Sequence, residues 1–479
     1  MTSPRRPLWT YAALSGGSAL ILAAAPAQYL GRQQDDLLYI VASQSLAHGS
    51  YRLDTAVGRP LLSTITPGWP ALLLPLSLLC PDRLGAYQLF AALLQAAVPW
   101  AVFAWARKRL GDSQAALLAL LCAASPLLLS QAGAVMSETP YLLATLGLFW
   151  TLERGGARAR AGAAAGGWLA ALLQLRPAGA SLVPAALAGF SRARRKRPLL
   201  EAAAIAGGVT AAWGALSWWL ARTSAADAGK LAYAGRSWAA PLALGGLEKP
   251  LFYARSLGGG FVPAAWARSS AGAALGAALM LSAAWGCARA LKARWDDPPA
   301  LALAGTAGML AVWAWQYERY WIPALPLLFW ACARAWGRAA KPLLAALLAL
   351  ELAFGAPAWV AGTSWRRPEL SRTYAWISAS LAPGEALASA AYVRDGFWTG
   401  RPGAPLPDTD TAAEFAAQLR AQRVRAALWQ ERLDIGVAER DRAYLQGRLL
   451  RAGEHLKDAA YFEEVHRDDE EGTRVYRPR

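Results

Sequence analysis

Apolar residues along this chain gather in blocks of about 20, which is the length that crosses a bilayer as an α-helix. These blocks predict eleven spanning helices, at residues 9–29, 86–106, 114–132, 139–152, 162–175, 178–190, 199–220, 270–290, 299–315, 320–336 and 342–360. A further apolar stretch, 66–81, contains Pro67, Pro70 and Pro75. Because prolines disturb a straight helix, we expect this stretch to lie at the membrane interface. The pattern predicts a mainly α-helical, polytopic membrane protein.

The pattern changes after residue 360, where no apolar block of spanning length remains. Amphipathic segments at 369–381, 411–422 and 436–453 alternate there with strand-like runs at 386–392, 424–429, 460–466 and 473–477. Such alternation is typical of an α/β domain. We therefore expect a transmembrane module at residues 1–360, with a long first outer loop at 30–65, and a small soluble α/β domain at 361–479.

The composition agrees with a membrane protein and excludes several other classes. Of the 479 residues, 56% are hydrophobic and 17% are charged, whereas a soluble domain has about 25% charged residues. The net charge of +17 comes entirely from the part before Arg366, which has 31 basic and 14 acidic residues; 18 of each follow. These values exclude a soluble enzyme, a coiled coil, a disulfide scaffold and a disordered regulator.

The basic residues indicate membrane topology rather than nucleic acid binding. They form six short clusters that fall in alternate connections between the apolar blocks. Basic residues concentrate in this way in the cytoplasmic loops of membrane proteins. The N-terminus is then cytoplasmic, and an odd number of spans places the C-terminal domain outside. We expect no nucleic acid partner.

Two adjacent carboxylates, Asp35 and Asp36, follow the first predicted span. A carboxylate at the membrane surface is disfavoured unless it is paired or has a function. Crowding raises the pKa of one member of such a pair, which suits a general base, and carboxylate oxygens also bind divalent cations. Simpler interpretations are that the pair lies at a solvated loop end or that it caps a helix over Leu37–Ala47.

A third carboxylate, Glu138, lies in a very short outward turn between two predicted spans. This position directly before Thr139 and Pro140 is equally typical of an acidic residue at the start of a helix. Glu138 is therefore a candidate for the same site as the aspartate pair, with helix capping as the competing explanation.

Positive charge is expected at the same outward level. Arg176 and Arg319 lie in outward turns, and Lys230 and Arg255 lie in a longer outward loop. Arginine can bind a phosphate through paired hydrogen bonds, although snorkelling to the interface is the simpler explanation. Glu318, next to Arg319, can form a purely local ion pair.

The order of these motifs resembles that of the GT-C membrane glycosyltransferases, especially the bacterial branch of aminoarabinose transferases and protein O-mannosyltransferases. The similar segments are Asp35-Asp36-x-x-Tyr39, Leu46-Ala47-His48-Gly49, Thr66-Pro67-Gly68-Trp69-Pro70, Ser137-Glu138-Thr139-Pro140, Leu175-Arg176-Pro177 and Glu318-Arg319-Tyr320-Trp321-Ile322-Pro323. The resemblance extends over essentially the whole chain. It implies a GT-C fold with a C-terminal domain outside the membrane.

The resemblance also implies the reaction. A sugar is transferred, with inversion, from a polyprenyl-phosphate-linked donor to a lipid, glycan or protein acceptor at the outer face of a bacterial plasma membrane. In that family an acidic residue of the first outer loop is the catalytic base, which corresponds to Asp35 or Asp36 here. We favour Asp35 as the base and Asp36 as its orienting or metal-holding neighbour.

Other residues of the matching motifs receive supporting roles. The residues expected to bind the donor phosphate are Arg319, Arg176, Arg255 and Lys230. Those expected to support the site or the acceptor are Glu138, Tyr39, Glu318, Tyr320 and His48. Some branches use a divalent cation (Mg²⁺, Mn²⁺ or Zn²⁺) and others do not. If one is used here, its expected ligands are Asp35, Asp36 and Glu138.

Two other functions fit part of the pattern. A lipid-linked sugar flippase or transporter also has many spans, but transporters usually carry internal repeats and polar groups at mid-membrane. Here the polar candidates gather on one face. A non-catalytic envelope assembly protein would bind partners through its C-terminal domain and would not need the aspartate pair. The sequence therefore favours a glycosyltransferase.

Overall fold

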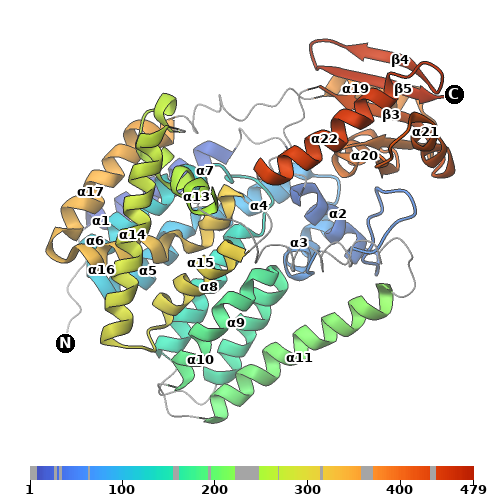
Figure 1. Ribbon diagram of the computed structural model, residues 1–479. Helices are drawn as coiled ribbons and strands as arrows, with labels where there is room; N and C mark the ends of the chain where they lie inside the picture. Colours follow the sequence, from blue (N-terminus) through green and yellow to red (C-terminus); the bar gives the residue numbers. More distant parts are fainter. Residues whose placement is uncertain are drawn as a thin grey trace.

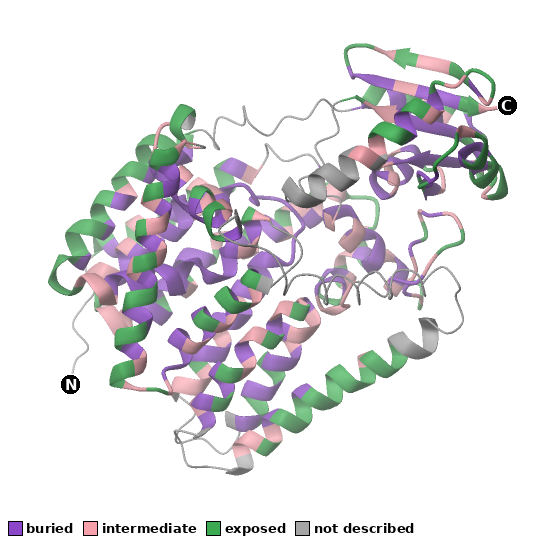
Figure 2. Ribbon diagram, in the orientation of Figure 1, coloured by how far each residue is buried: buried purple, intermediate pink, exposed green. Residues whose placement is uncertain are grey.

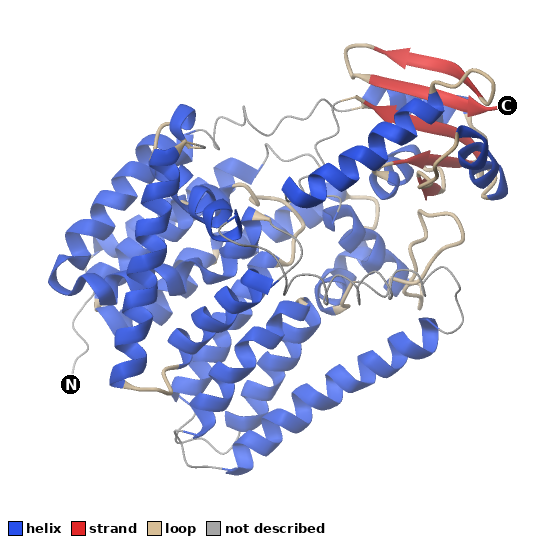
Figure 3. Cartoon of the chain, viewed as in Figure 1, coloured by secondary structure: helices blue, strands red, loops and turns tan. Residues whose placement is uncertain are grey.

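The structure is a computed structural model that describes residues 8–25, 30–31, 35–62, 65–154, 161–191, 196–221, 248–267, 269–312, 317–357, 370–431 and 439–479. A large helical part comes first, and a sheet with flanking helices follows at the C-terminal end (Figures 1 and 3). The described helices and helical turns of the first part are α1 (Leu8–Ala24), α2 (Asp35–Ala47), α3 (Gly68–Leu79), α4 (Leu84–Ala96), α5 (Val98–Leu110), α6 (Asp112–Ala124), α7 (Pro126–Leu129), α8 (Glu138–Arg154), α9 (Ala161–Leu175), η3 (Pro177–Leu182), α10 (Val183–Ser191), α11 (Lys196–Ala221), α13 (Glu248–Gly258), η5 (Gly259–Phe261), η6 (Ala264–Trp266), α14 (Ser270–Ala293), α15 (Pro298–Val312), η7 (Glu318–Ala324), α16 (Leu325–Trp336), η8 (Gly337–Ala339), α17 (Ala340–Leu350) and η9 (Glu351–Gly355).

Three helices are long and apolar enough to cross a membrane: Leu84–Leu110, Pro198–Leu216 and Ser270–Ala293. Shorter apolar helices, such as Leu8–Ala24 and Asp112–Ala124, accompany them. All eleven ranges predicted to span are largely helical, and the interfacial stretch 66–81 contains α3. The protein is therefore a multi-pass, mainly helical membrane protein, and the total of eleven spans stays a prediction.

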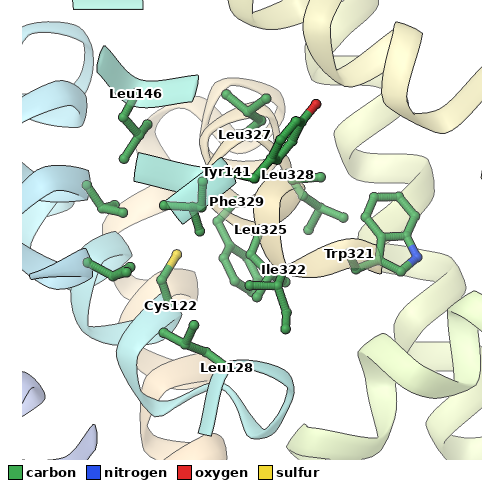
Figure 4. Close-up of a cluster of buried hydrophobic side chains, with 14 of the residues drawn as sticks. Cys122, Leu128, Tyr141, Leu146, Trp321, Ile322, Leu325, Leu327, Leu328 and Phe329 are labelled. Carbon is green, nitrogen blue, oxygen red and sulfur yellow. The ribbon is translucent and has the colours of Figure 1, made fainter. Parts of the chain in front are cut away.

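The interior and the surface of the helical part are both apolar, as expected for helices in lipid. A buried cluster lies where α6, α8, η7 and α16 meet (Figure 4), and its labelled members include Cys122, Tyr141, Ile322 and Phe329. On the outside, α11 and the outer faces of α14 and α17 are largely exposed (Figure 2). Large apolar side chains there, such as Leu281 of α14, indicate a surface that contacts lipid.

Glycines allow several of these helices to approach closely. A Cβ on Gly276 of α14 would overlap the carbonyl oxygen of Ala254 in α13, and one on Gly286 would overlap that of Ala331 in α16. Small residues at helix crossings are typical of membrane proteins, because close packing rather than the hydrophobic effect holds the helices together.

The C-terminal end forms a five-stranded sheet with strand order β2-β1-β3-β5-β4. The strands are β1 (Ala386–Ser389), β2 (Gly403–Pro405), β3 (Val424–Gln430), β4 (Phe462–Asp468) and β5 (Thr473–Pro478), and the helices are α19 (Ser371–Ser380), α20 (Tyr392–Thr399), α21 (Ala412–Ala421) and α22 (Glu439–Leu456). β2, β1 and β3 are parallel, whereas β5 and β4 are antiparallel to their neighbours. Alternate residues of β1 pack on opposite faces: Ala386 and Ala388 with Phe415 of α21, and Leu387 with Ile377 of α19.

The sequence predicted this α/β arrangement but missed two elements. α20 and β2 lie where we expected the end of a strand and a loop. α20 is important for the site because it packs on α2, the helix that carries the aspartate pair (Figure 1). Its two-turn length and its internal Gly396 leave a weak helical pattern in the sequence.

Candidate active site

The candidate site begins with an ion pair between the start of α2 and η7. Arg319 Nη2 donates a hydrogen bond to Asp35 Oδ2 at 2.5 Å, across 284 residues of sequence. Asp35 is the first residue of α2, where the helix dipole favours an acidic side chain. The Arg319 side chain is 7% exposed, whereas that of Asp35 is 42% exposed. The pair is therefore buried on its arginine side and accessible on its carboxylate side.

The interactions continue from Arg319 to the start of α8 and back to α2. Glu138 Oε1 lies 3.2 Å from Arg319 Nε and 2.5 Å from Arg176 Nη1. Arg176 Nη1 also donates to Ser137 Oγ at 3.3 Å, and Ser137 Oγ lies 2.9 Å from the Tyr39 hydroxyl. Burial raises the pKa of Tyr39 to about 12, so its hydroxyl stays protonated. We call Asp35, Tyr39, Ser137, Glu138, Arg176, Arg319 and Tyr320 the polar cluster.

Aromatic rings cover both guanidinium groups. The Tyr320 ring centre lies 5.2 Å from the guanidinium carbon of Arg176 and 5.9 Å from that of Arg319. The Tyr317 ring centre lies 4.6 Å from that of Arg319. Cation–π contact of this kind stabilises a partly desolvated arginine, and the rings restrict the positions that the two side chains can take.

Prolines place these charged residues at helix ends. Arg176 precedes Pro177 and has an extended backbone, because a residue before proline disfavours the helical conformation. α9 therefore ends at Leu175, and Arg176 turns toward the site. At the start of α8, Pro140 lies in the first turn, where its missing N–H has no consequence. Glu138 can thus begin the helix and face the two arginines.

The charges of the polar cluster balance, since two carboxylates face two guanidinium groups. The Glu138 side chain is 1% exposed and that of Arg176 is 17% exposed. Removing one partner of a buried ion pair costs about 3–5 kcal/mol, because the other charge remains without compensation. The two carboxylates therefore hold the two arginines side by side, where the two positive charges would otherwise repel each other.

Asp36 turns away from the polar cluster. Its Oδ2 accepts the backbone N–H of Gly31 at 2.9 Å, and its Oδ1 accepts that of Leu37 at 2.9 Å. Burial raises the pKa of Asp36 to about 6, although the two backbone hydrogen bonds act in the opposite direction. Asp36 therefore links Gly31 to the first turn of α2 through backbone hydrogen bonds, and neither of its oxygens is bonded to the polar cluster.

A cavity of about 60 Å³ adjoins the polar cluster. Its lining combines Glu138, Tyr141, Arg176 and Tyr320 with the residues Pro177, Ala178, Thr306, Met309 and Pro323. The cavity has room for only a few atoms. Mostly apolar residues of η3, α15 and η7 therefore line the same cavity as the charged Glu138 and Arg176.

Most of the residues selected from the sequence meet in the polar cluster. The six that do are Asp35, Tyr39, Glu138, Arg176, Arg319 and Tyr320. Sequence reasoning did not assign a role to Ser137 or Tyr317. Both flank an assigned residue in the motifs, and this proximity is the signal that would have identified them.

Other selected residues lie elsewhere. His48 is exposed at the far end of α2, where its Nδ1 lies 2.9 Å from the carbonyl oxygen of Gln44. Arg255 is exposed on α13, and Glu318 is exposed at the start of η7. Lys230 lies outside the described residues. The phosphate role expected for Arg255 and the supporting role expected for His48 therefore gain no support from these positions.

The residues expected to hold a metal do not form a metal site. Both oxygens of Asp36 accept backbone hydrogen bonds, and the cationic Arg319 bridges Asp35 and Glu138. Among the residues that the structure describes, no group of three or more His, Cys, Asp or Glu side chains is arranged to bind a metal ion. This donor set does not fit a divalent cation.

Comparisons with known proteins identify the fold. No family model and no curated protein matches the sequence. Among solved structures, ArnT from Cupriavidus metallidurans bound to undecaprenyl phosphate is similar, with 12% identity, a TM-score of 0.57 and coverage of 98% of this chain and 97% of that chain.

Two further enzymes are similar. The Archaeoglobus fulgidus oligosaccharyltransferase tethered with an acceptor peptide has 12% identity, a TM-score of 0.56 and coverage of 99% and 74%. A complex of that enzyme with Zn and sulfate also matches, with 12% identity, a TM-score of 0.52 and coverage of 93% and 71%. Arabinofuranosyltransferase AftD from Mycobacteria has 15% identity, a TM-score of 0.50 and coverage of 99% and 40%. The chain therefore has the fold of the GT-C membrane glycosyltransferases.

Proposed function

We propose that this protein is a membrane glycosyltransferase that transfers a sugar from a polyprenyl-phosphate-linked donor to an acceptor. The observation that carries the proposal is the meeting of Asp35, Arg319, Glu138 and Arg176 within a helical fold of this class. The reaction needs a base for the acceptor and positive charge for the phosphate. An accessible carboxylate beside two arginines supplies both.

Asp35 is the base in this proposal. A general base has to reach the proton that it removes. The Asp35 carboxylate is accessible, whereas both oxygens of Asp36 are buried and accept backbone N–H groups. This geometry outweighs the raised pKa of Asp36, which by itself would suit a base at neutral pH. Asp36 binds the backbone N–H of Gly31 and so helps to hold the start of α2, which carries Asp35.

Arg319 and Arg176 neutralise the donor phosphate in this proposal. A phosphate at Arg319 would compete with Asp35 for the same guanidinium group, so phosphate binding and release of the base would be coupled. The cavity beside Arg176 has room for only the first few atoms of such a donor, and its lining is mostly apolar. ArnT, which has the same fold, binds undecaprenyl phosphate.

The proposed step is a single displacement. The acceptor hydroxyl gives its proton to Asp35 while its oxygen bonds to the anomeric carbon of the sugar. The bond between that carbon and the phosphate oxygen breaks, and its electron pair remains on the phosphate. The arginines stabilise the polyprenyl phosphate as it leaves. Attack opposite the leaving group inverts the anomeric carbon.

The proposal includes a location and an organisation. The polar cluster would lie at the outer face of a bacterial inner membrane, with the N-terminus in the cytoplasm. Residues 1–360 would form the transmembrane catalytic module, and residues 361–479 a domain outside the membrane. The acceptor would be a lipid, a glycan or a protein, which approaches Asp35 from the outer side.

The test is sugar transfer in membranes that contain the full chain. Radiolabelled polyprenyl-phosphate sugars, extracted from bacterial membranes, serve as the donor mixture. Asp35→Asn should reduce incorporation at least about 100-fold, because it removes the base. Asp54→Asn is the matched control, since Asp54 is an aspartate of the same segment whose arginine partner, Arg59, is exposed. Label that crosses the bilayer without incorporation, equally in wild type and Asp35→Asn, would indicate a flippase instead.

A further inference from the structure

α20 of the C-terminal sheet region packs along α2. Its residues Tyr392, Val393 and Phe397 join a cluster with Val41 and Ala42 of α2. The same cluster includes residues of the segment after α2, namely Tyr51, Leu53, Ala56 and Leu62. The helix that carries Asp35 is therefore supported along its length by a helix more than 350 residues later in the chain.

The segment just before α2 is held by two side chains of α20. The Trp398 indole N–H donates a hydrogen bond to the carbonyl oxygen of Leu30 at 3.2 Å. Gly31 lies against Arg394, since a Cβ on Gly31 would be 2.6 Å from Arg394 Cγ. Gly31 has a φ of +96°, a conformation that favours glycine. Its N–H is one of the two that bind the Asp36 carboxylate.

The segment after α2 is held by the edge of the sheet. Gly403 of β2 donates its N–H to the carbonyl oxygen of Thr55 at 2.7 Å, and its own carbonyl oxygen accepts the N–H of Val57 at 2.9 Å. Ala56 thus pairs with Gly403 as a short parallel bridge. The backbone on both sides of α2 is consequently attached to α20 and to the adjoining strand β2.

α20 is in turn attached to α19 and β3 by a buried hydrogen-bond network. Asp395 is completely buried and accepts hydrogen bonds from Tyr374 at 2.7 Å, Arg394 at 2.9 Å and Gln430 at 3.1 Å. Arg394 also donates to the Gln430 side chain at 2.8 Å. A fully satisfied buried network of this kind fixes the side chains that belong to it. Arg394 therefore presents a fixed surface to Gly31.

We propose that α20 is a clamp for the active-site helix and that Trp398 and Arg394 are positioning residues, which set the location of Asp35 through Leu30, Gly31 and Asp36. The inference rests on the proposed function, because it assigns a catalytic consequence to the position of Asp35. It gives the C-terminal region a specific task in the reaction. Trp398 and Arg394 act on the reacting groups only indirectly, through the backbone of Leu30 and Gly31.

The test compares two tryptophan-to-phenylalanine variants of the full chain. Trp398→Phe removes the N–H donor to Leu30 and keeps most of the ring. Trp376→Phe is the matched control, because Trp376 is similarly half-buried but lies on α19 and stacks on His466. Transfer from the extracted polyprenyl-phosphate sugars is measured at saturating and at limiting donor, beside the unfolding temperature.

The clamp predicts a specific pattern. Trp398→Phe should lower the rate at saturating donor about tenfold, because small displacements of a catalytic group reduce rates strongly. The donor concentration at half-saturation should change less than about twofold, and the unfolding temperature should match that of Trp376→Phe. Trp376→Phe should retain the wild-type rate. A wild-type rate in Trp398→Phe, or a loss fully explained by a smaller folded fraction, would overturn the inference.

Hydrogen–deuterium exchange separates the clamp from the proposed function. In Trp398→Phe, exchange in the peptide covering residues 35–47 should accelerate while exchange in β1 and β3 stays slow. Equal exchange in both tryptophan variants would contradict the clamp even if transfer is active. If wild type transfers no sugar, the proposed function fails, and the exchange data alone decide whether α20 holds α2. Gly31→Ala provides a second variant, if Trp398→Phe does not fold, and it should show the same loss of rate.

Discussion

Glu138 and Arg176 form a 2.5 Å ion pair in which the carboxylate is almost completely removed from solvent. Arg319 lies 3.2 Å from the same carboxylate oxygen. Two guanidinium groups converge in this way on one buried acid, and Asp35 provides the second negative charge. Glu138 therefore has a structural role that makes the rest of the cluster possible, since without it the two arginines would repel each other.

Replacing Glu138 with Gln should destabilise the protein by about 3–5 kcal/mol, because two buried arginines would then face one carboxylate. The measurement is the unfolding temperature of the purified protein in detergent. Asp469→Asn is the control, since the Asp469 ion pair with Arg467 is exposed and such pairs contribute little. Equal unfolding temperatures for wild type and Glu138→Gln would show that the ion pair does not carry this free energy.

The double variant Glu138→Gln with Arg176→Gln should be more stable than Glu138→Gln alone. Removing both charges restores the balance that removing one destroys, so the two effects are not additive. A double-mutant cycle of unfolding temperatures measures this coupling. Purely additive losses would mean that Glu138 and Arg176 do not interact in the folded protein.

Arg319→Lys should weaken donor use more than stability. Lysine keeps the positive charge, but it cannot bond Asp35 and Glu138 through separate nitrogens as the guanidinium does. We expect the donor concentration at half-saturation to rise about tenfold in the transfer assay. Arg255→Lys, on the exposed face of α13, should leave this value unchanged. If both variants change the donor concentration at half-saturation equally, Arg319 has no specific role in binding the donor phosphate.

The stability of the protein should depend on the ionisation of Asp36. Burial raises its pKa from the ordinary value of 3.8 to about 6. A carboxyl group whose pKa is raised by folding stabilises the folded state fully below pH 3.8, and this contribution is lost as the pH rises through 6. The free energy of unfolding of wild type, relative to Asp36→Asn, should therefore fall by about 2 kcal/mol between pH 4 and pH 7.

This pH comparison isolates Asp36 because every other titrating group is shared by the two proteins. In Asp36→Asn, the NH2 group of the new amide faces the backbone N–H of Gly31 or Leu37. This change alters the stability of the variant equally at all pH values, so it adds no pH dependence. Unfolding temperatures at several pH values measure the difference. A difference that is constant with pH would show that the pKa of Asp36 is unchanged by folding.

Close helix packing provides a prediction outside the polar cluster. Gly276→Ala should destabilise the protein by about 1–3 kcal/mol, because the added methyl group would overlap the carbonyl oxygen of Ala254. Gly308→Ala is the matched control in α15, since a Cβ there meets no atom within 4 Å. The unfolding temperature should fall for the first variant and stay level or rise for the second. Equal behaviour would mean that α13 and α14 do not cross at Gly276.

Local patterns predicted the parts of the site that depend on near neighbours in the sequence. The apolar blocks predicted the helices, and the prolines beside Arg176 and Glu138 predicted that charged residues would lie at helix ends. The alternation in residues 361–479 predicted three of the four described helices and four of the five strands there. It missed α20 because two helical turns with an internal Gly396 make a weak local pattern.

The sequence by itself determined which residue types stand at the ends of which helices, because hydrophobic period, proline geometry and charge placement act over a few residues. Only the tertiary structure decided how these ends meet. Asp35 and Asp36 are neighbours with the same side chain, yet one faces Arg319, 284 residues away, and the other binds the backbone of Gly31. Burial and partners set their roles, and both depend on long-range packing that no local pattern encodes.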